Sequence, residues 1–209
     1  MAARRLTPIV LGLALSACSV IGVRAGTEEP HYTVIGEVGP MTVRQYGPRV
    51  AAETWVTGDA ERARSIGFQR LAGYIFGANH GKARIAMTAP VAQAASGKTI
   101  AMTAPVAQAR AGESWVIRFF MPAKETLADL PIPNNAEVRL VAVPAETYAV
   151  LRFSGVPSPA RVTEKTRALL AGLAGSAWHA NGVPVAWFYD PPWTLPPLRR
   201  NEVAVPVTR

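Results

Sequence analysis

Apolar and polar side chains alternate with a period of two between Tyr32 and Val56, as they do in strands of a sheet. Two Gly-Pro pairs, at residues 39–40 and 47–48, interrupt this alternation and are typical of turns. The pattern therefore predicts three successive strands, at residues 32–35, 41–46 and 50–56.

The spacing of apolar residues then changes to that of a helix. Asp59 is a predicted N-cap, because its side chain can accept hydrogen bonds from the first free backbone N–H groups. Gly77 and Asn79 are residues that commonly end a helix. The predicted apolar stripe of this helix contains Ala63, Gly67, Leu71 and Ile75, joined by Ile66, Phe68 and Tyr74.

A tandem repeat follows the first helix. The ten residues at 85–94, IAMTAPVAQA, recur identically at 100–109 with a period of fifteen. Two copies are too few for a solenoid, so we expect either a hairpin of matched strands or a strand plus loop used twice. The central prolines are expected at strand ends or bulges, because proline cannot donate to a sheet ladder.

The remainder of the chain repeats the order strands, helix, strands. Ser158 is a predicted cap and Pro159 a predicted first residue of the second helix. Its apolar stripe contains Val162, Thr166, Leu169, Leu170 and Leu173. Strands are predicted at 114–121, 137–143, 147–153, 183–189 and 201–207. The fold class is therefore α+β, with two similar halves, a curved antiparallel sheet and two helices packed on it.

The N-terminal residues have the features of an export signal. Arg4 and Arg5 precede a mostly apolar run that is too short to span a bilayer. The sequence Leu-Ser-Ala-Cys that ends at Cys18 resembles the bacterial lipobox, which implies cleavage before Cys18 and lipidation of its thiol. We therefore expect a signal peptide at 1–17, a lipidated Cys and tether at 18–30, and a globular domain at 31–209. An ordinary signal cleaved after Ala25 is the alternative.

This anchor predicts an exported protein on the periplasmic face of the outer membrane, because Ser19 rather than an aspartate follows Cys18. Hydrophobic residues make up 49% of the chain and charged residues 17%, which suits one well-packed domain. The net charge is +8, but the basic residues are scattered, with no run longer than the pairs Arg4-Arg5 and Arg199-Arg200 and no basic stripe, which argues against nucleic acid as a partner. The positive charge is explained equally well by a basic surface that faces an anionic membrane or an acidic ligand, or by a contribution to solubility.

Several separated motifs resemble the SOUL heme-binding family. They stand in the order of that family and cover almost everything from residue 31 to the end: Arg44–Tyr46 with Pro48, Phe68–Asn79, the two Ile-Ala-Met-Thr-Ala-Pro-Val segments, Tyr148–Gly155, Trp187–Thr194 and Leu198–Val203. The resemblance implies a pseudo-twofold distorted antiparallel β-barrel with two helices, related to the effector-binding domains of bacterial multidrug regulators.

The resemblance also implies a tetrapyrrole slot against the first helix and the following loop. Its walls would be Phe68, Leu71, Tyr74, Ile75, Met87 and Met102. Lys82 and Arg84 would pair with propionates, and His80 is the candidate axial ligand of the iron. Each residue has a plainer interpretation: the apolar ones as core packing, Lys82, Arg84 and His80 as a solvated loop.

A second candidate cluster contains Trp187, Tyr189, Trp193 and the run Arg199–Glu202. Its structural interpretation, which we favour, is an aromatic floor with Arg and Glu paired across neighbouring strands.

No catalytic motif accompanies these residues: the chain has no Gly-x-Ser-x-Gly elbow, no phosphate loop and no His-Glu-x-x-His. Its single cysteine, expected to carry lipid, leaves no internal disulfide. We therefore expect a non-catalytic heme or tetrapyrrole carrier or buffer at the cell envelope. The alternatives are a binding module for another amphipathic ligand (a bilin, a lipid or a cationic drug) and an envelope structural or interaction protein without a ligand.

Overall fold

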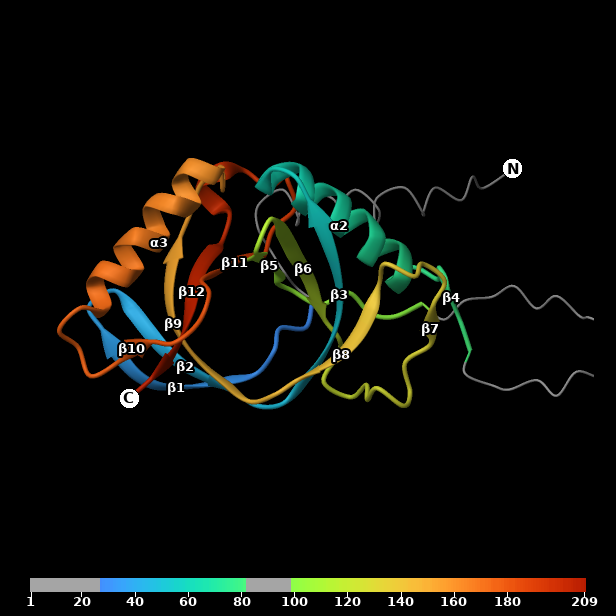
Figure 1. The fold of residues 1–209 in the computed structure, drawn as a ribbon, viewed down its shortest axis with the longest axis horizontal. Coiled ribbons are helices and arrows are strands. Elements are labelled where there is room, and N and C mark those ends of the chain that lie inside the picture. The colour runs from blue at the N-terminus through green and yellow to red at the C-terminus, as the bar shows by residue number, and fades with distance from the viewer. Residues whose placement is uncertain (1–26, 82–98) are drawn as a thin grey trace, which may run out of the picture.

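A computed structural model describes residues 27–81 and 99–209, which form a curved sheet with two helices on its outer face (Figure 1). The first stretch contains β1 (Tyr32–Val38), β2 (Met41–Tyr46), β3 (Arg49–Thr57), α2 (Ala60–Ile75) and β4 (Asn79–His80). The second contains β5 (Val106–Ala111), β6 (Ser114–Phe120), β7 (Ile132–Pro133), β8 (Arg139–Val143), β9 (Glu146–Phe153), α3 (Pro159–Leu173), β10 (His179–Ala180), β11 (Val185–Phe188) and β12 (Asn201–Thr208). Within these two stretches, no helix has the length and apolar character needed to cross a membrane.

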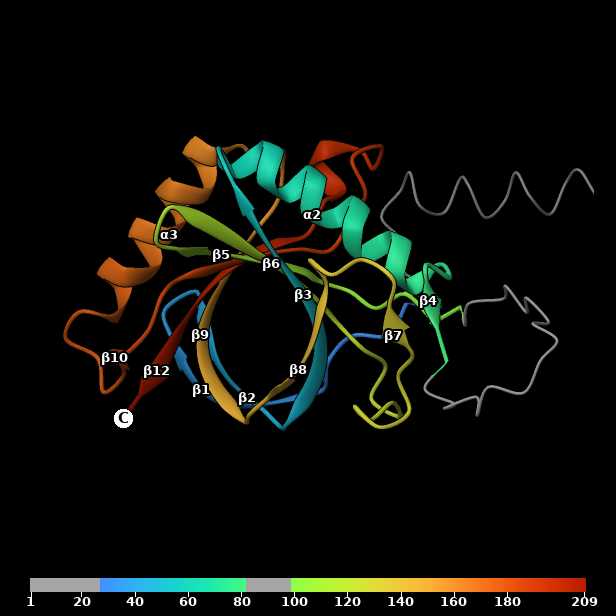
Figure 2. The same cartoon turned by 45° about the vertical axis from the view of Figure 1, so that its right-hand side comes forward.

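The large sheet has the strand order β1-β2-β9-β12-β11-β5-β6-β3-β8, with β10 added beside β12, and every pairing in it is antiparallel. Figure 2 shows the sheet curling so that β2 and β9 face β3 and β8. The predicted α+β class with an antiparallel sheet and two helices is confirmed. A closed barrel is not formed by the described residues, because the edge strands β1 and β8 pair only with β2 and β3.

The predicted two similar halves are visible in the topology. One half consists of β2, β3, α2, β5 and β6, and the other of β8, β9, α3, β11 and β12. Exchanging each of these elements with its counterpart reverses their strand order and leaves the pairings among them in place; β1 and β10 stand outside this relation. The helices obey the same relation, since α2 packs on β3 and β6 while α3 packs on β9 and β12. In this arrangement β2 pairs with β9 and β8 pairs with β3, so each half contributes one strand to the other.

Helix α2 begins and ends at the residues that the sequence predicted. Asp59 is the N-cap, and its Oδ1 accepts hydrogen bonds from the backbone N–H groups of Glu61 (3.1 Å) and Arg62 (2.9 Å). Gly77 follows the helix with a φ of 112°, a left-handed conformation in which glycine has no Cβ penalty. The buried face of the helix contains five of the seven residues of the predicted stripe: Ala63, Gly67, Leu71, Tyr74 and Ile75. The other two are not enclosed, because Ile66 is half-buried and Phe68 is exposed.

Helix α3 also has the predicted cap, because Ser158 Oγ accepts from the backbone N–H of Arg161 at 3.4 Å. Its apolar stripe is narrower than predicted. Leu169 and Leu173 are buried against the sheet, whereas Leu170 is an exposed residue. Only the i, i+4 pair that faces β9 and β12 is therefore enclosed.

Both faces of the large sheet contribute to buried cores. Along β3, Ala51 points to the inner side of the curve, whereas Ala52 packs under α2; along β12, Ala204 points inward, whereas Val203 and Val205 pack under α3. The sheet therefore has an outer core beneath each helix and an inner core enclosed by its own curvature. The buried residues of the inner core are Tyr46, Ala51, Ala104, Ala107, Phe120, Val143, Tyr148, Val150, Trp187, Tyr189 and Ala204.

The second copy of the tandem repeat supplies β5. Pro105 immediately precedes that strand, as expected for a proline beside a sheet ladder. Strand β5 pairs with β6 on one side and with β11 on the other. Both of its edges are occupied, so the predicted hairpin between the two copies does not form along β5. The first copy, at residues 85–94, lies outside the described residues.

The close approach of α2 to the sheet predicts a clash at Gly67. A Cβ atom there would contact Ile117 Cγ1 and lie 2.6 Å from Ile117 Cβ. Alanine favours a helix interior over glycine by about 1 kcal/mol, but overpacking costs about 1–3 kcal/mol. We therefore expect Gly67→Ala to lower the free energy of unfolding, measured by urea denaturation.

Gly73→Ala is the matched control in the same helix, because a Cβ atom there meets only Ala78 Cβ, at 3.9 Å. This variant should be as stable as the natural protein or more stable. Equal unfolding free energies for the two variants would contradict the close helix–sheet contact.

Candidate functional site

Three of the predicted slot residues are closed off from solvent beneath α2. Leu71, Tyr74 and Ile75 are each at most 1% exposed and belong to the outer core. The Tyr74 hydroxyl donates to the backbone oxygen of Pro131 at 3.0 Å, and burial raises the pKa of Tyr74 to about 12. In this conformation their side chains fill the core and offer no surface to a ligand.

Three other predicted site residues lie at the surface. Phe68 and Met102 are each 40% exposed, and the Phe68 ring lies against Phe119 with ring centroids 5.4 Å apart. His80 is exposed on β4, with its Nδ1 2.6 Å from Asn134 Oδ1. The described residues hold no group of three or more His, Cys, Asp or Glu side chains that could bind a metal ion. The remaining predicted site residues lie outside the described ones: Cys18, Lys82, Arg84 and Met87.

A groove of about 600 Å³ lies beside the N-terminal half of α2. Arg70 lines it, and binds the Glu137 carboxylate at 2.8 Å and the backbone oxygen of Trp55 at 3.0 Å. None of the predicted slot residues lines this groove, and its walls are mostly polar. It therefore differs from the mostly apolar concave site that a tetrapyrrole requires.

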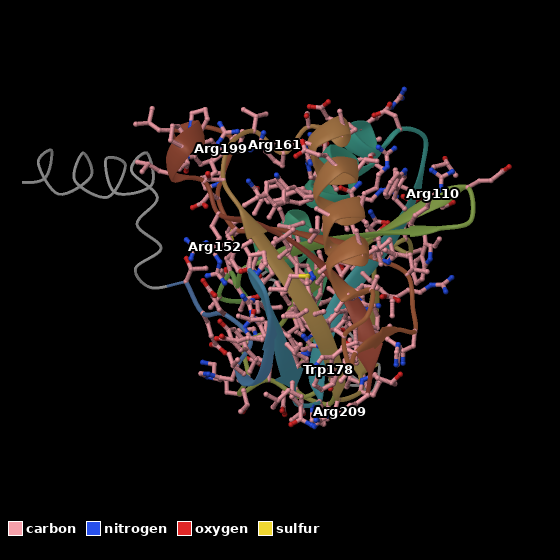
Figure 3. All side chains as sticks on the ribbon, turned by 90° about the vertical axis from the view of Figure 1, so that its left-hand side faces the viewer. Arg110, Arg152, Arg161, Trp178, Arg199 and Arg209 are labelled. Atoms are coloured by element: carbon pink, nitrogen blue, oxygen red, sulfur yellow. The ribbon has the colours of Figure 1, made fainter. Side chains whose placement is uncertain are left out.

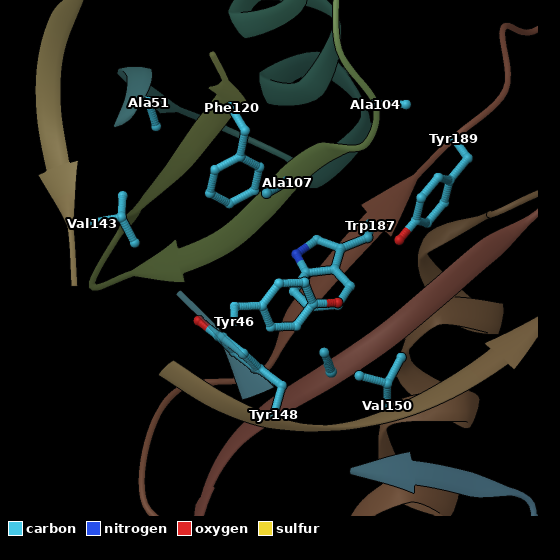
Figure 4. Close-up of a cluster of buried hydrophobic side chains, with 11 residues drawn as sticks. Tyr46, Ala51, Ala104, Ala107, Phe120, Val143, Tyr148, Val150, Trp187 and Tyr189 are labelled. Carbon is cyan, nitrogen blue, oxygen red and sulfur yellow. The ribbon is translucent and has the colours of Figure 1, made fainter. Parts of the chain in front are cut away.

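The inner side of the curved sheet holds an aromatic cluster (Figure 4). The rings of Tyr46, Tyr148 and Trp187 contact one another edge to face, with centroids 5.2–6.1 Å apart. A small space beside them, which we call the inner hollow, has a volume of about 10 Å³, room for about one water molecule. The inner hollow is lined by Glu29, Pro30, Tyr32, Tyr46, Arg49, Pro105, Phe120, Trp187 and Tyr189.

Glu202 of β12 is a fully buried carboxylate next to this hollow. Arg44 donates to both of its oxygens (2.8 and 3.2 Å), Arg200 Nε donates at 3.0 Å, and the Tyr189 hydroxyl donates at 2.8 Å. Burial disfavours the Arg44 cation, but its hydrogen bond to Glu202 and the carboxylate charge together raise its pKa. Burial and the charge of Glu202 also raise the pKa of Tyr189, which keeps the phenol protonated as a donor.

Arg49 lies in the wall of the inner hollow between two aromatic rings. Its guanidinium carbon is 4.6 Å from the Tyr46 ring centroid and 4.5 Å from that of Phe120. Its Nη2 binds Glu146 at 2.6 Å, yet burial outweighs this charge and lowers the pKa of Arg49. Among the described residues, the buried Nε of Arg49 has no hydrogen-bond partner. The wall of the hollow therefore contains an unsatisfied donor.

Residues 28–30, which we call the N-terminal strap, close one side of the inner hollow. The backbone oxygen of Glu28 accepts from the N–H of Ala104 at 2.9 Å, and its Oε1 accepts from the N–H of Ala123 at 2.7 Å. Glu28 also forms an isolated parallel bridge with Thr103. The segment predicted as tether is therefore bonded to the domain from Glu28 onward.

Glu29 of the strap binds Arg200 through both carboxylate oxygens, at 3.0 and 3.1 Å from Nη1. The Arg200 guanidinium carbon lies 3.8 Å from the Tyr189 ring centroid. Its Nη2 also forms an ion pair with Glu202, at 2.9 Å from Oε1. Burial disfavours the Arg200 cation, but Tyr189 and the two carboxylates together raise its pKa. One arginine thus joins the strap to the buried network.

The second candidate cluster has a structural role, as we favoured, but its pairing differs from the prediction. Arg200 and Glu202 lie two residues apart in the same stretch of chain, not on neighbouring strands, and the Tyr189 hydroxyl donates to Glu202. The arginine that reaches Glu202 from another strand is Arg44 of β2. Trp193 instead is 63% exposed, and Arg199 donates to a backbone oxygen of the preceding loop at 2.7 Å. Figure 3 shows Arg199 and Arg161 together at one end of the molecule.

The sequence did not assign Arg44, Arg49 or Glu29 to a candidate site, although Arg44 stands in one of the family motifs. One usable pattern for Arg44 was its position two residues before Tyr46, which places both side chains on the inner face of β2. A charged residue there requires a buried partner, but only the folded sheet identifies Glu202, 158 residues away, as that partner.

No curated protein sequence matches the chain. Solved structures show similarity of fold at low identity. The C-terminal domain of EcmrR has a TM-score of 0.58 at 11% identity, covering 85% of this chain and 98% of that one. EcmrR in a complex with DNA has a TM-score of 0.57 at 11% identity, covering 81% and 57%. A hydrolase from Listeria innocua has a TM-score of 0.49 at 11% identity, covering 88% and 94%.

The profile of the SOUL heme-binding protein family matches residues 27–206. This range spans the strap, both halves of the sheet, both helices and the buried network around Glu202. The chain therefore belongs to the SOUL heme-binding protein family.

Proposed function

We propose that this chain binds heme or another tetrapyrrole and carries or buffers it at the cell envelope, without catalysing a reaction. The observation that carries the proposal is the family match over residues 27–206. The residue types around the inner hollow also suit this ligand class, since a tetrapyrrole needs apolar contact for its ring and cations for its propionates.

The closed conformation does not fit a tetrapyrrole inside the sheet. The inner hollow, at about 10 Å³, has room for one water molecule. On the outer surface, Phe68 and Met102 offer exposed apolar atoms and His80 offers an exposed imidazole. A bound heme would supply a flat apolar ring and an iron that accepts an axial ligand. The protein would supply apolar contact and hydrogen-bond donors, at this surface or in an opened hollow.

A second candidate function is an envelope structural or interaction protein that binds no small ligand. The closed inner hollow is the observation that favours it, because the side chains of the sheet fill the space themselves. Ligand titration separates the two functions.

Hemin titration of the purified full-length chain tests the proposed function. We expect a saturable shift of the Soret band at micromolar hemin. If His80 is the axial ligand, His80→Ala should also change the spin state of the iron and weaken binding about tenfold, or ~1.4 kcal/mol.

His179→Ala is the matched control. His179 is an exposed histidine on β10, the first strand after α3, just as His80 lies on β4, the first strand after α2. It should leave the spectrum unchanged. The absence of any Soret shift in the natural chain would overturn the proposed function and favour the ligand-free one.

We further propose that Cys18 carries the lipid that holds the chain at the envelope. The support is the sequence Leu-Ser-Ala-Cys after an apolar run. Since stable anchoring needs more than one acyl chain, we expect Cys18→Ser to move the protein from the membrane fraction to the soluble fraction. Fractionation and metabolic labelling with a radioactive fatty acid measure this. Membrane association that is unchanged in Cys18→Ser would contradict the anchor.

A further inference from the structure

Beside the inner hollow, the buried hydrogen-bond acceptor is satisfied whereas one buried donor is not. Both oxygens of Glu202 are occupied by Arg44, Arg200 and Tyr189. On the donor side, Arg49 Nε is buried with no partner in the described part of the chain. An unsatisfied buried donor costs about 1–3 kcal/mol, so this wall favours a group that accepts hydrogen bonds.

The strap contains one apolar side chain, that of Pro30, and its other contacts with the domain are polar. It is held by two hydrogen bonds to Glu28 and by the contact between Glu29 and Arg200. Glu28 is exposed, and Glu29 and Pro30 are only half-buried. A segment near a terminus with little buried apolar surface opens at low free-energy cost. The strap is therefore the part of the wall most easily moved.

The contact between Glu29 and Arg200 is a carboxylate bound to an arginine that the protein already holds in place. Without Glu29, the Arg200 guanidinium would still be oriented by Glu202 and by the face of the Tyr189 ring. Two arginines, Arg44 and Arg200, would then share the single charge of Glu202. Arg200 would thus present its Nη1 to another carboxylate without reorganisation.

We propose that the N-terminal strap is displaced by a ligand and that the inner hollow beneath it binds a flat aromatic carboxylate, whose carboxylate replaces Glu29 on Arg200. The ring lies against Tyr46, Trp187 and Tyr189 in the space that displacement of the strap enlarges. This inference rests on the proposed function in one respect, because a tetrapyrrole with propionates belongs to this ligand class. The excess of donors selects an anionic ligand over a cationic one.

The test compares the full-length natural chain with two variants. Glu29→Gln keeps the shape of the strap but removes its charge, so we expect hemin to bind about fivefold tighter, as loss of a partly exposed ion pair allows. Arg200→Lys keeps the positive charge that Glu202 requires but removes the planar fork, so hemin should bind about tenfold more weakly. Glu164→Gln is the matched control, because Glu164 pairs with Lys165 on the surface of α3.

Hemin dimethyl ester, which lacks free carboxylates, separates ring contact from carboxylate contact. Arg200→Lys should weaken hemin binding while leaving ester binding within about twofold of the natural chain. Pyrenebutyrate, followed by its fluorescence, provides a flat aromatic carboxylate unrelated to heme. It should show the same order of affinities across the variants.

Amide hydrogen exchange reports on the strap directly, because the N–H groups of Ala104 and Ala123 bind Glu28. Both amides should exchange faster when ligand saturates the chain, and also in ligand-free Glu29→Gln compared with Glu164→Gln.

The outcomes are distinguishable. If hemin binds but Ala104 and Ala123 keep their protection and Glu29→Gln has no effect on affinity, the strap proposal is overturned and the proposed function stands. If hemin binds no variant but pyrenebutyrate follows the expected order, tetrapyrrole binding fails while the site stands. If neither ligand binds any variant, both proposals fall.

Discussion

The carboxylate of Glu202 lies without solvent contact in β12, where Arg44 and Arg200 balance its charge and the Tyr189 hydroxyl donates a further hydrogen bond. Loss of the partners of a buried charge destabilises a fold by several kcal/mol. These contacts therefore constrain the segments that carry the partner side chains. Arg44 ties β2 to β12 across the intervening strand β9, and Arg200 reaches the strap. The strand register, the position of the strap and the shape of the inner hollow therefore depend on one ionic network.

The elements of the fold could be predicted because their causes are local. The cap at Asp59, the cap at Ser158 and the i, i+4 stripes depend on neighbours in sequence, and they lie where the pattern indicated. Closure of the sheet could not be predicted, because it depends on whether the edge strands β1 and β8 meet. The alternation of apolar and polar residues with a period of two predicts which face of a strand is buried, but it does not predict how strongly the sheet curves.

The candidate site was harder to predict for a physical reason. The apolar stripe with Leu71, Tyr74 and Ile75 fits a ligand slot and a helix core equally well, and only packing against the sheet distinguishes them. The strap has no period of its own, so Glu28 and Glu29 resembled the rest of the tether. Their role emerges from contacts with residues far along the chain, including Arg200, 171 positions away.

The exchange of β2 and β8 between the two halves has a consequence for how such a chain can be divided. A protein made of one half alone would lack the strand that its partner half provides. It could complete its sheet by folding its own equivalent strand back onto itself, or by exchanging that strand with a second copy, as in a domain-swapped dimer. The chain has in this sense the topology of a swapped dimer whose two copies are joined covalently, so each half meets its sheet partner at an effective concentration that separate copies would lack.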